Sequence, residues 1–353
     1  MSEPRTDTDA PPPSGQGAGE YSLSVVVPAY NEHEVLEEFH RRLIAVFASL
    51  PGASCEVVYI NDGSTDNTLQ LMRDIQASDA RVSVVDLSRN YGKEIALTAG
   101  LDHARGDAIV VIDADLQDPP EVIPELIAQW RNGFEVVYAK RTGREGESTI
   151  KKATAAGFYR LIRRVSRVQI PEDTGDFRLL SRRAVGALGK LREQHRFMKG
   201  LFAWIGFSQK AVPYRRDPRF AGESKFNYWR LWNFALEGIT SFTIAPLKAA
   251  TYLGLIVATL SFLAAAWVVY KTFVFGDPVR GYPSLMVVVL FLGGVQLLFI
   301  GIMGEYLGRI FNESKNRPLY FLNSYEPGNS LPPPQPLPQK RAREVEIETL
   351  ASR

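Results

Sequence analysis

Cysteine is nearly absent from this sequence, with Cys55 alone among 353 residues, so no disulfide can form within the chain. An excess of charge is missing as well. The 41 basic and 39 acidic side chains leave a net charge of +2, which gives no whole-chain reason to expect nucleic-acid binding. Residues 1–20 lack the apolar run of a signal peptide, and their polar, Pro- and Gly-rich composition predicts a disordered tail. The glycines of 15–19 follow no predicted strand and complete no dinucleotide-binding motif.

Short β-branched runs alternate with helical patterns over the first 140 residues. Segment 34–50, for example, keeps the apolar spacing of a helix. The alternation predicts an α/β domain with a doubly wound, mostly parallel sheet. Its expected strands are 23–27, 56–60, 82–87, 108–112 and 135–139.

Polar side chains follow the ends of three of these strands. Ligands bind at the carboxyl ends of strands in open α/β sheets. A pair of carboxylates there favours a hard divalent cation that is shared with substrate phosphates. One acidic pair alone is more often a solvated turn, and one aspartate alone is more often a helix cap, but three such strand ends favour a binding site. The residues are Tyr30 and Glu32 after the first strand, Asp62 after the second, and Asp113 and Asp115 after the fourth.

Six segments carry a resemblance to a known family. Segments 27–32 (VPAYNE), 61–64 (NDGS) and 113–120 (DADLQDPP) resemble family 2 glycosyltransferases of the GT-A fold. Segments 89–94 (RNYGKE), 174–180 (TGDFRLL) and 220–225 (FAGESK) are similar to the polyprenyl-phosphate branch, which includes dolichol-phosphate mannose synthases and bacterial undecaprenyl-phosphate glucosyltransferases. The resemblance runs in order from about Leu23 to Phe311.

The resemblance implies roles for matching residues. Pro28, Tyr30, Glu32 and Asp62 would hold the nucleoside of the donor, while Arg141, Arg219 and Lys225 would contact its phosphates. Asp113, Ala114, Asp115 and Gln117 would form the diphosphate site, in which Asp115, Gln117 and Asp113 bind Mg²⁺ or Mn²⁺. Catalysis would depend on Asp115, Asp176, Arg219 and Lys225. Asp176 stands where mannose synthases usually carry a small hydroxyl residue, which resembles the glucosyl-transferring members. The processive signature Q-x-x-R-W is absent.

Two long apolar runs follow the α/β pattern. Segment 249–270 contains no charged residue, and segment 284–303 has only Gln296 as a strongly polar side chain. Each is long enough to span a bilayer as a helix, and the short linker 271–283 predicts a hairpin. Basic residues are denser after the second run than in the linker, which predicts that both chain ends are cytoplasmic.

Two further segments are predicted to lie at the membrane surface. Segment 149–168 has the pattern of a basic amphipathic helix, and segment 226–246 is rich in aromatic residues. A solvated helix face and ordinary core packing are the respective alternatives. The expected organisation is a disordered tail (1–20), a GT-A domain (21–225), interfacial helices (226–247), two transmembrane helices (248–312) and a partly disordered cytoplasmic tail (313–353).

The function that the resemblance implies is inverting, metal-dependent sugar transfer from a nucleotide sugar to a membrane polyprenyl phosphate. Glucose from UDP-glucose and undecaprenyl phosphate are the preferred substrates, and the bacterial inner membrane, with cell-envelope glycan modification, is the expected setting. Mannose, galactose and N-acetylglucosamine stay open, as does a homo-oligomer. A different class is a non-catalytic nucleotide-sugar-binding subunit of a polysaccharide assembly complex, which the intact Asp113 and Asp115 disfavour. A transferase acting on protein or glycan hydroxyls is a further alternative, which the predicted hairpin disfavours.

Overall fold

A computed structural model describes residues 20–142, 174–194, 196–215 and 281–331. It also describes residue 247 and, within 252–274, residues 252–257, 259–260, 263, 266–267, 270 and 274. Arg219, Lys225, the basic segment 149–168 and the aromatic segment 226–246 lie outside the described residues.

The described residues form one eight-stranded sheet in the order β7-β5-β6-β4-β1-β2-β3-β8. Strand β6 is antiparallel to both β4 and β5, and β8 is antiparallel to β3, while the other pairs are parallel. The predicted mostly parallel α/β sheet is therefore confirmed. The strands are β1 (Tyr21–Ala29), β2 (Ala53–Asn61), β3 (Val82–Leu87), β4 (Ala108–Val111), β5 (Val136–Arg141), β6 (Thr174–Ser181), β7 (Gln209–Tyr214) and β8 (Leu322–Glu326).

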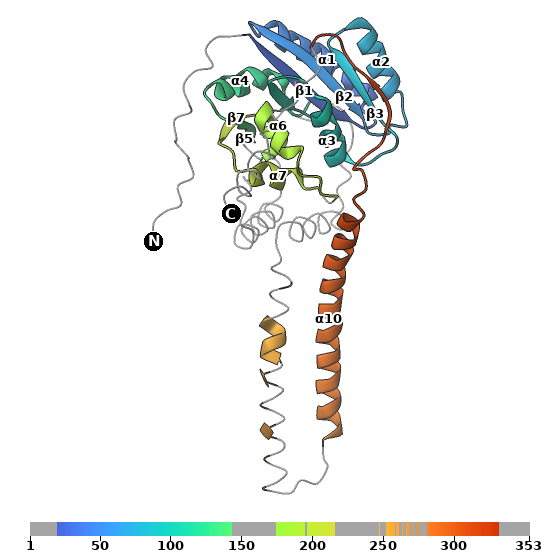
Figure 1. Cartoon of the computed structure of the whole chain (residues 1–353), viewed down its shortest axis with the longest axis vertical. Coiled ribbons are helices and arrows are strands. Elements are labelled where there is room, and N and C mark those ends of the chain that lie inside the picture. Colours follow the sequence, from blue (N-terminus) through green and yellow to red (C-terminus); the bar gives the residue numbers. More distant parts are fainter. Residues whose placement is uncertain are drawn as a thin grey trace, which may run out of the picture.

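Helices cover both faces of the sheet (Figure 1). One core contains Val25 and Val27 of β1 together with Phe39, and the opposite core contains Val26 together with Leu97. Both faces are thus buried, which explains why the central strands are continuous apolar runs. The helices around the sheet are α1 (His33–Ala48), α2 (Thr68–Ser78), α3 (Lys93–His103), the short 3-10 helix η1 (Pro120–Val122), α4 (Ile123–Arg131), α6 (Arg182–Leu188) and α7 (Met198–Trp204).

Helix α3 lies unusually close to the sheet because of a glycine. A Cβ added at Gly100 would lie 2.6 Å from Cδ1 of Ile60 on β2, closer than real side chains approach. A second glycine, Gly63 in the loop after β2, allows the loop before α3 to pack closely against it. Gly63 has φ +65°, and an added Cβ there would lie 2.5 Å from the carbonyl carbon of Arg89. The two loops that end β2 and β3 are therefore in direct contact.

The strand at one edge of the sheet comes from the end of the described chain. Strand β8 pairs with β3 from Val84↔Glu326 to Leu87↔Leu322. The sequence predicts a tail beyond the GT-A domain for 313–353, whereas the structure adds Leu322–Glu326 to the sheet. The sequence of this strand, LNSYE, has no apolar run that would reveal it. In Figure 1 the chain leaves the long helix α10 and returns to the side of the sheet that carries β3.

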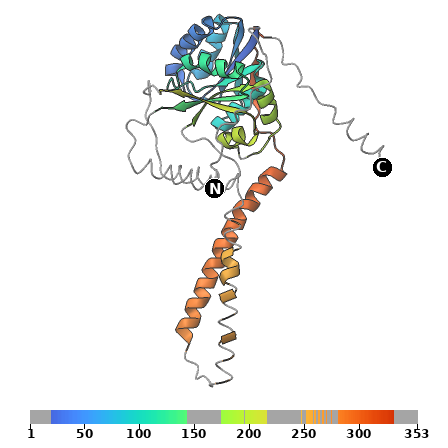
Figure 2. The same ribbon diagram turned by 90° about the vertical axis from the view of Figure 1, so that its left-hand side faces the viewer.

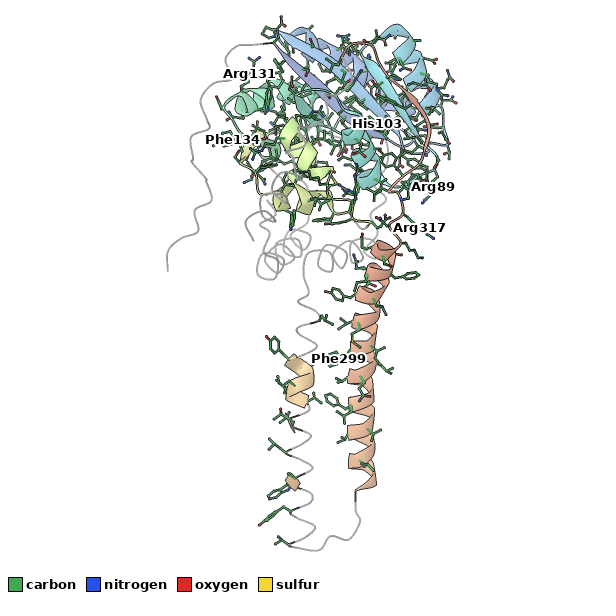
Figure 3. The ribbon with its side chains drawn as sticks, in the orientation of Figure 1. Arg89, His103, Arg131, Phe134, Phe299 and Arg317 are labelled. Carbon is green, nitrogen blue, oxygen red and sulfur yellow. The ribbon has the colours of Figure 1, made fainter. Side chains whose placement is uncertain are left out.

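Helix α10 (Tyr282–Ser314) extends far from the sheet (Figure 2). Among the described residues, its part Phe291–Ser314 is the one helix long and apolar enough to cross a membrane, and none of that apolar stretch is buried within the protein. Residues 252–257 of the other predicted span are helical. A Cβ added at Gly254 would lie 3.6 Å from Cε2 of Phe299, so this piece lies against α10 (Figure 3).

Candidate active site

A cleft of about 560 Å³ opens at the carboxyl ends of the central strands. Nine of the residues selected from the sequence line it, and Gln117, with only 7% of its surface exposed, does not. The nine are Pro28, Tyr30, Glu32, Asp62, Asp113, Ala114, Asp115, Arg141 and Asp176. Seven residues without an assigned role also line the cleft, among them Asn90, Gly92, Lys93 and Lys199.

The loop after β4 has an unusual backbone. Leu116 has φ +58°, although its side chain is large and only 2% exposed. A bulky residue rarely adopts this conformation, and such residues concentrate at functional sites. The loop is held by a hydrogen bond of 3.1 Å from the Gln117 N–H to Oδ1 of Asp115. Gln117 therefore supports Asp115 through its backbone, while Ala114 and Asp115 face the cleft.

Asp62 organises the loop that precedes α3. Its two carboxylate oxygens accept hydrogen bonds from the backbone N–H groups of Tyr91 (2.7 Å) and Gly92 (3.0 Å). Burial raises the pKa of Asp62, and these two hydrogen bonds act in the opposite direction. Asp62 lines the cleft as expected, and its carboxylate also fixes where α3 begins. Asp62 accepts backbone N–H groups as a helix cap does. These groups belong to the loop before α3, however, and not to the start of α2, the helix that directly follows Asp62.

Lys93, the first residue of α3, joins two carboxylates from different strands. Its Nζ lies 2.7 Å from Oδ2 of Asp113, after β4, and 2.5 Å from Oδ2 of Asp176, on β6. Burial works against its charge, but the two carboxylates raise the pKa of Lys93 above its ordinary value. The side chain is still 44% exposed in the open cleft, so water screens part of the attraction.

The two ion pairs of Lys93 were not predicted from the sequence. The residue stands inside segment 89–94, which carried the family resemblance but suggested no role for the lysine. Lys199, at the start of α7, belongs to no motif at all. Both lysines reach the cleft only because α3 and α7 converge on it, and a hydrogen bond of 3.2 Å from the Met198 N–H to Glu94 joins the two helix starts.

The charges around Asp176 shift one another's pKa values. Burial opposes the negative charge of Asp176, but Lys93 and Lys199 lower its pKa to about 2. Burial and the charge of Asp176 raise the pKa of Glu94 to about 7, with Lys93 opposing. Burial also raises the pKa of Asp113, and Lys93 again opposes the shift. Asp176 and Lys93 are thus an ionised pair at neutral pH, whereas Glu94 gains and loses its proton near neutrality.

The raised pKa of Glu94 predicts a pH dependence of stability. Between the ordinary value of 4.5 and about 7, the unfolded chain loses the Glu94 proton while the folded protein keeps it. The free energy of unfolding should therefore fall as pH rises through this range. Replacing Glu94 by Gln should make this fall in the free energy of unfolding smaller by roughly 1–3 kcal/mol. Thermal unfolding of both proteins in detergent at about pH 5 and pH 8 measures it, and parallel pH profiles would contradict the assignment.

Arg141, at the end of β5, faces the cleft beside a buried acid. Its Nη2 lies 3.9 Å from Oδ1 of Asp118, and its Nε donates to the Tyr214 hydroxyl at 3.2 Å. Tyr214 in turn donates a short hydrogen bond to Asp118. Gly175 leaves the space for this arrangement, because an added Cβ would lie 2.9 Å from Nη2 of Arg141. The guanidinium is thus held at the cleft wall, where an anionic ligand can reach it.

The residues at the end of β4 fit a divalent cation that a substrate helps to bind. Asp113 and Asp115 offer hard oxygen donors to the cleft, and Mg²⁺ typically uses one or two carboxylates together with phosphate oxygens. Within the described ranges, no cluster of three or more His, Cys, Asp or Glu side chains forms a complete protein cage. A site of this kind would depend on the phosphates of a bound ligand.

Two family models match the sequence. The model described as glycosyl transferase family 2 matches residues 24–189, and the model described as GtrB C-terminal hairpin matches residues 245–310.

Relatives are similar over most of both chains. An uncharacterized glycosyltransferase of Synechocystis is 52% identical, over 85% of this chain and 94% of its own. The bactoprenol glucosyl transferase of Shigella phage SfV is 51% identical, over 86% of this chain and 98% of its own. A prophage bactoprenol glucosyl transferase homolog of Escherichia coli is 48% identical, over 85% and 98%. Solved structures are more distant. Glucosyl-3-phosphoglycerate synthase from Mycobacterium tuberculosis is 19% identical, with a TM-score of 0.42 over 62% of this chain and 78% of that one.

Proposed function

The chain belongs to glycosyl transferase family 2, and from this premise we propose that it transfers glucose from UDP-glucose to a membrane polyprenyl phosphate. The observation that supports the proposal most is the near 50% identity to bactoprenol glucosyl transferases over almost their full length. The cleft agrees with it, because Asp113, Asp115 and Arg141 all line a space large enough for a nucleotide sugar.

In the proposed reaction, an oxygen of the acceptor phosphate forms a bond to the anomeric carbon of glucose. The bond from that carbon to the donor diphosphate breaks, its electrons stay on the diphosphate, and UDP leaves, with inversion at the carbon. A phosphate monoester has a second pKa of about 6, so the acceptor is already largely ionised at neutral pH. The reaction therefore needs positive charge near the leaving group more than it needs a strong general base.

Asp115, with Asp113, would hold the divalent metal, Mg²⁺ or Mn²⁺, which supplies that positive charge to the leaving diphosphate. The backbone N–H of Gln117 would keep Asp115 in place. Arg141 would face the diphosphate from the cleft wall. Pro28, Tyr30 and Glu32 would hold the nucleoside, and Asp62 would shape the loop beside it. Arg219 and Lys225 would add further charge, as segment 220–225 suggests by resemblance.

Asp176 and Lys93 would act on the glucose of the donor, within this cleft. Oδ1 of Asp176 is buried and accepts no hydrogen bond from the described residues, while Oδ2 contacts Lys93. A sugar hydroxyl would satisfy the remaining oxygen, because a buried acceptor without a donor is costly. We therefore assign Asp176 to orientation of the glucose, with Lys93 fixing its position.

Donor competition tests this function directly. Purified full-length protein would receive undecaprenyl phosphate and, in turn, UDP-glucose, UDP-galactose, UDP-N-acetylglucosamine and GDP-mannose. We expect the highest kcat/KM with UDP-glucose. A higher value for any other donor would overturn the choice of glucose and leave the family unchanged. No turnover with any donor, despite nucleotide binding, would favour the non-catalytic subunit.

The C-terminal hairpin match and the apolar helix within α10 indicate membrane association. We further propose two spans in a bacterial inner membrane, with the cleft and both chain ends in the cytoplasm. Reporter fusions before Leu23 and after Arg353 should then both show cytoplasmic activity, because basic residues are denser after α10 than in the hairpin linker. Periplasmic labelling of either end would refute this topology.

A further inference from the structure

We propose that the segment after the membrane hairpin positions the active-site lysine. We call this segment, residues 315–331, the return segment. It makes hydrogen bonds at both ends of helix α3. Near the cleft its Phe321 contacts Tyr91, and at the far end of α3 its Tyr320 contacts Asp102. The activity part of the inference rests on the proposed glucosyl transfer, and the conformational part does not.

The first set of contacts is with the loop that leads into α3. The Ser88 N–H donates to the carbonyl of Phe321 at 2.9 Å, and the Phe321 N–H donates to the Tyr91 hydroxyl at 3.3 Å. The Tyr91 hydroxyl also lies 2.9 Å from the Ser88 hydroxyl. Arg89 covers the Tyr91 ring, with its guanidinium carbon 4.0 Å from the ring centre. Tyr91 is therefore fixed by the return segment through both its hydroxyl and its neighbours.

Tyr91 is two residues from Lys93, and the connection is rigid. The backbone N–H groups of Tyr91 and Gly92 are both held by Asp62, and Gly92 has φ +92°, a conformation that favours glycine. Helix α3 begins at the next residue, which is Lys93. Displacement of the Tyr91 hydroxyl would therefore shift the start of α3 and the two ion pairs that Lys93 makes with Asp113 and Asp176.

The second set of contacts is with the far end of α3. The Tyr320 hydroxyl donates to Oδ2 of Asp102 at 2.8 Å, and Arg192 binds the same carboxylate through two nitrogens, at 2.8 and 2.9 Å. The Tyr325 ring lies 4.6 Å from the ring of His103. Just beyond the helix, Nη2 of Arg105 donates to the carbonyl of Gly328 at 3.0 Å. The return segment thus lies along α3 as well as along the sheet.

A short stretch of chain connects the membrane hairpin to these contacts with α3. Only residues 315–320 lie between the end of α10 at Ser314 and Phe321. Near that end, Glu313 accepts a hydrogen bond of 2.7 Å from the Gln194 N–H. In Figure 3, Arg317 is labelled where the chain leaves α10, on the same side of the molecule as Arg89. The placement of the hairpin therefore acts on the loop that carries Lys93 into the cleft.

Tyr91→Phe and Tyr320→Phe test the proposal in the full-length protein, because each removes one hydroxyl and keeps the ring. Glu326→Gln is the matched control. It lies in the same segment, but its ion pair, 3.0 Å to Arg73, is with α2 rather than α3. We expect each tyrosine variant to lower kcat about fivefold, the size of one neutral hydrogen bond, with the KM for the donor within about twofold. We expect the control to match the unmodified protein.

Two readouts separate positioning from general loss of stability. Amide hydrogen exchange of residues 88–94 should become faster in Tyr91→Phe and stay unchanged in Glu326→Gln. In a Lys93→Met background, Tyr91→Phe should cause no further loss of kcat, because the hydroxyl would act through Lys93. Additive losses, unchanged exchange of 88–94, or an equal loss in the control would each overturn the proposal. If the protein transfers no glucose at all, the proposed function fails, and the exchange comparison still decides whether the segment holds the loop.

Discussion

Replacement of Asp115 by Asn is expected to reduce sugar transfer by at least about 10³-fold while the protein stays folded. The change removes one negative charge and almost no volume at the end of β4. It weakens the site proposed for the divalent cation, whose charge is worth several kcal/mol to the leaving diphosphate. The amide oxygen can still accept the Gln117 N–H that Oδ1 of Asp115 now accepts, so the loop should keep its shape.

Turnover with radiolabelled UDP-glucose and undecaprenyl phosphate measures the effect of this change. Asp74→Asn is the matched control, because Asp74 accepts a hydrogen bond from Gln70 on the surface of α2 and does not line the cleft. Wild-type turnover that survives rigorous chelation of divalent metals would refute the metal site. Unchanged turnover of Asp115→Asn would remove Asp115 from the mechanism.

Replacement of Lys93 by Met is expected to lower kcat by about 10²-fold, the size of losing one preorganised charged donor. Without the lysine, Asp113 and Asp176 lose the ammonium group that contacts both of them. One carboxylate would then take up a proton or turn away. Lys93→Arg keeps the charge with a different geometry. Its kcat should lie between those of Lys93→Met and the unmodified protein, because a planar guanidinium does not reproduce the contacts of an ammonium group.

The control for Lys93→Met is Lys190→Met, since Lys190 is exposed just after α6. Steady-state kinetics should show a loss in kcat for Lys93→Met and none for the control. Thermal unfolding of each variant separates a chemical effect from unfolding. A Lys93→Met protein that folds and keeps wild-type kcat would show that the bridge between the two carboxylates has no function in transfer.

The sequence predicted the features that local chemistry determines. The central strands are buried on both faces, so their β-branched runs are easy to identify. The acids at their carboxyl ends do line one cleft, as the topology of a parallel sheet requires. The bounds of β1 and β2 were underestimated, because Tyr21 and Ala53 extend the pairing beyond the apolar cores of those strands.

Features that depend on distant partners were not predictable. Lys93 looks like an ordinary first-turn lysine until β4 and β6 bring Asp113 and Asp176 to it. Asp62 looks like a cap for the helix that follows it, and only the contact at Gly63 brings the loop before α3 within reach of its carboxylate. Strand β8 is short and polar, and its partner lies far away in the sequence, so no pattern within it predicts pairing.

The late position of β8 has a consequence for how the protein is made. Asn323 donates to Oδ2 of Asp86 across 237 positions of sequence. At a synthesis rate of about 5–20 residues per second, β3 waits roughly 10–50 seconds for its edge partner. During that time both apolar spans leave the ribosome, and β3 presents an unpaired edge of the kind that promotes aggregation. Completion of the sheet therefore follows synthesis of the hairpin, and a nascent chain that stalls before residue 322 lacks the strand that covers this edge.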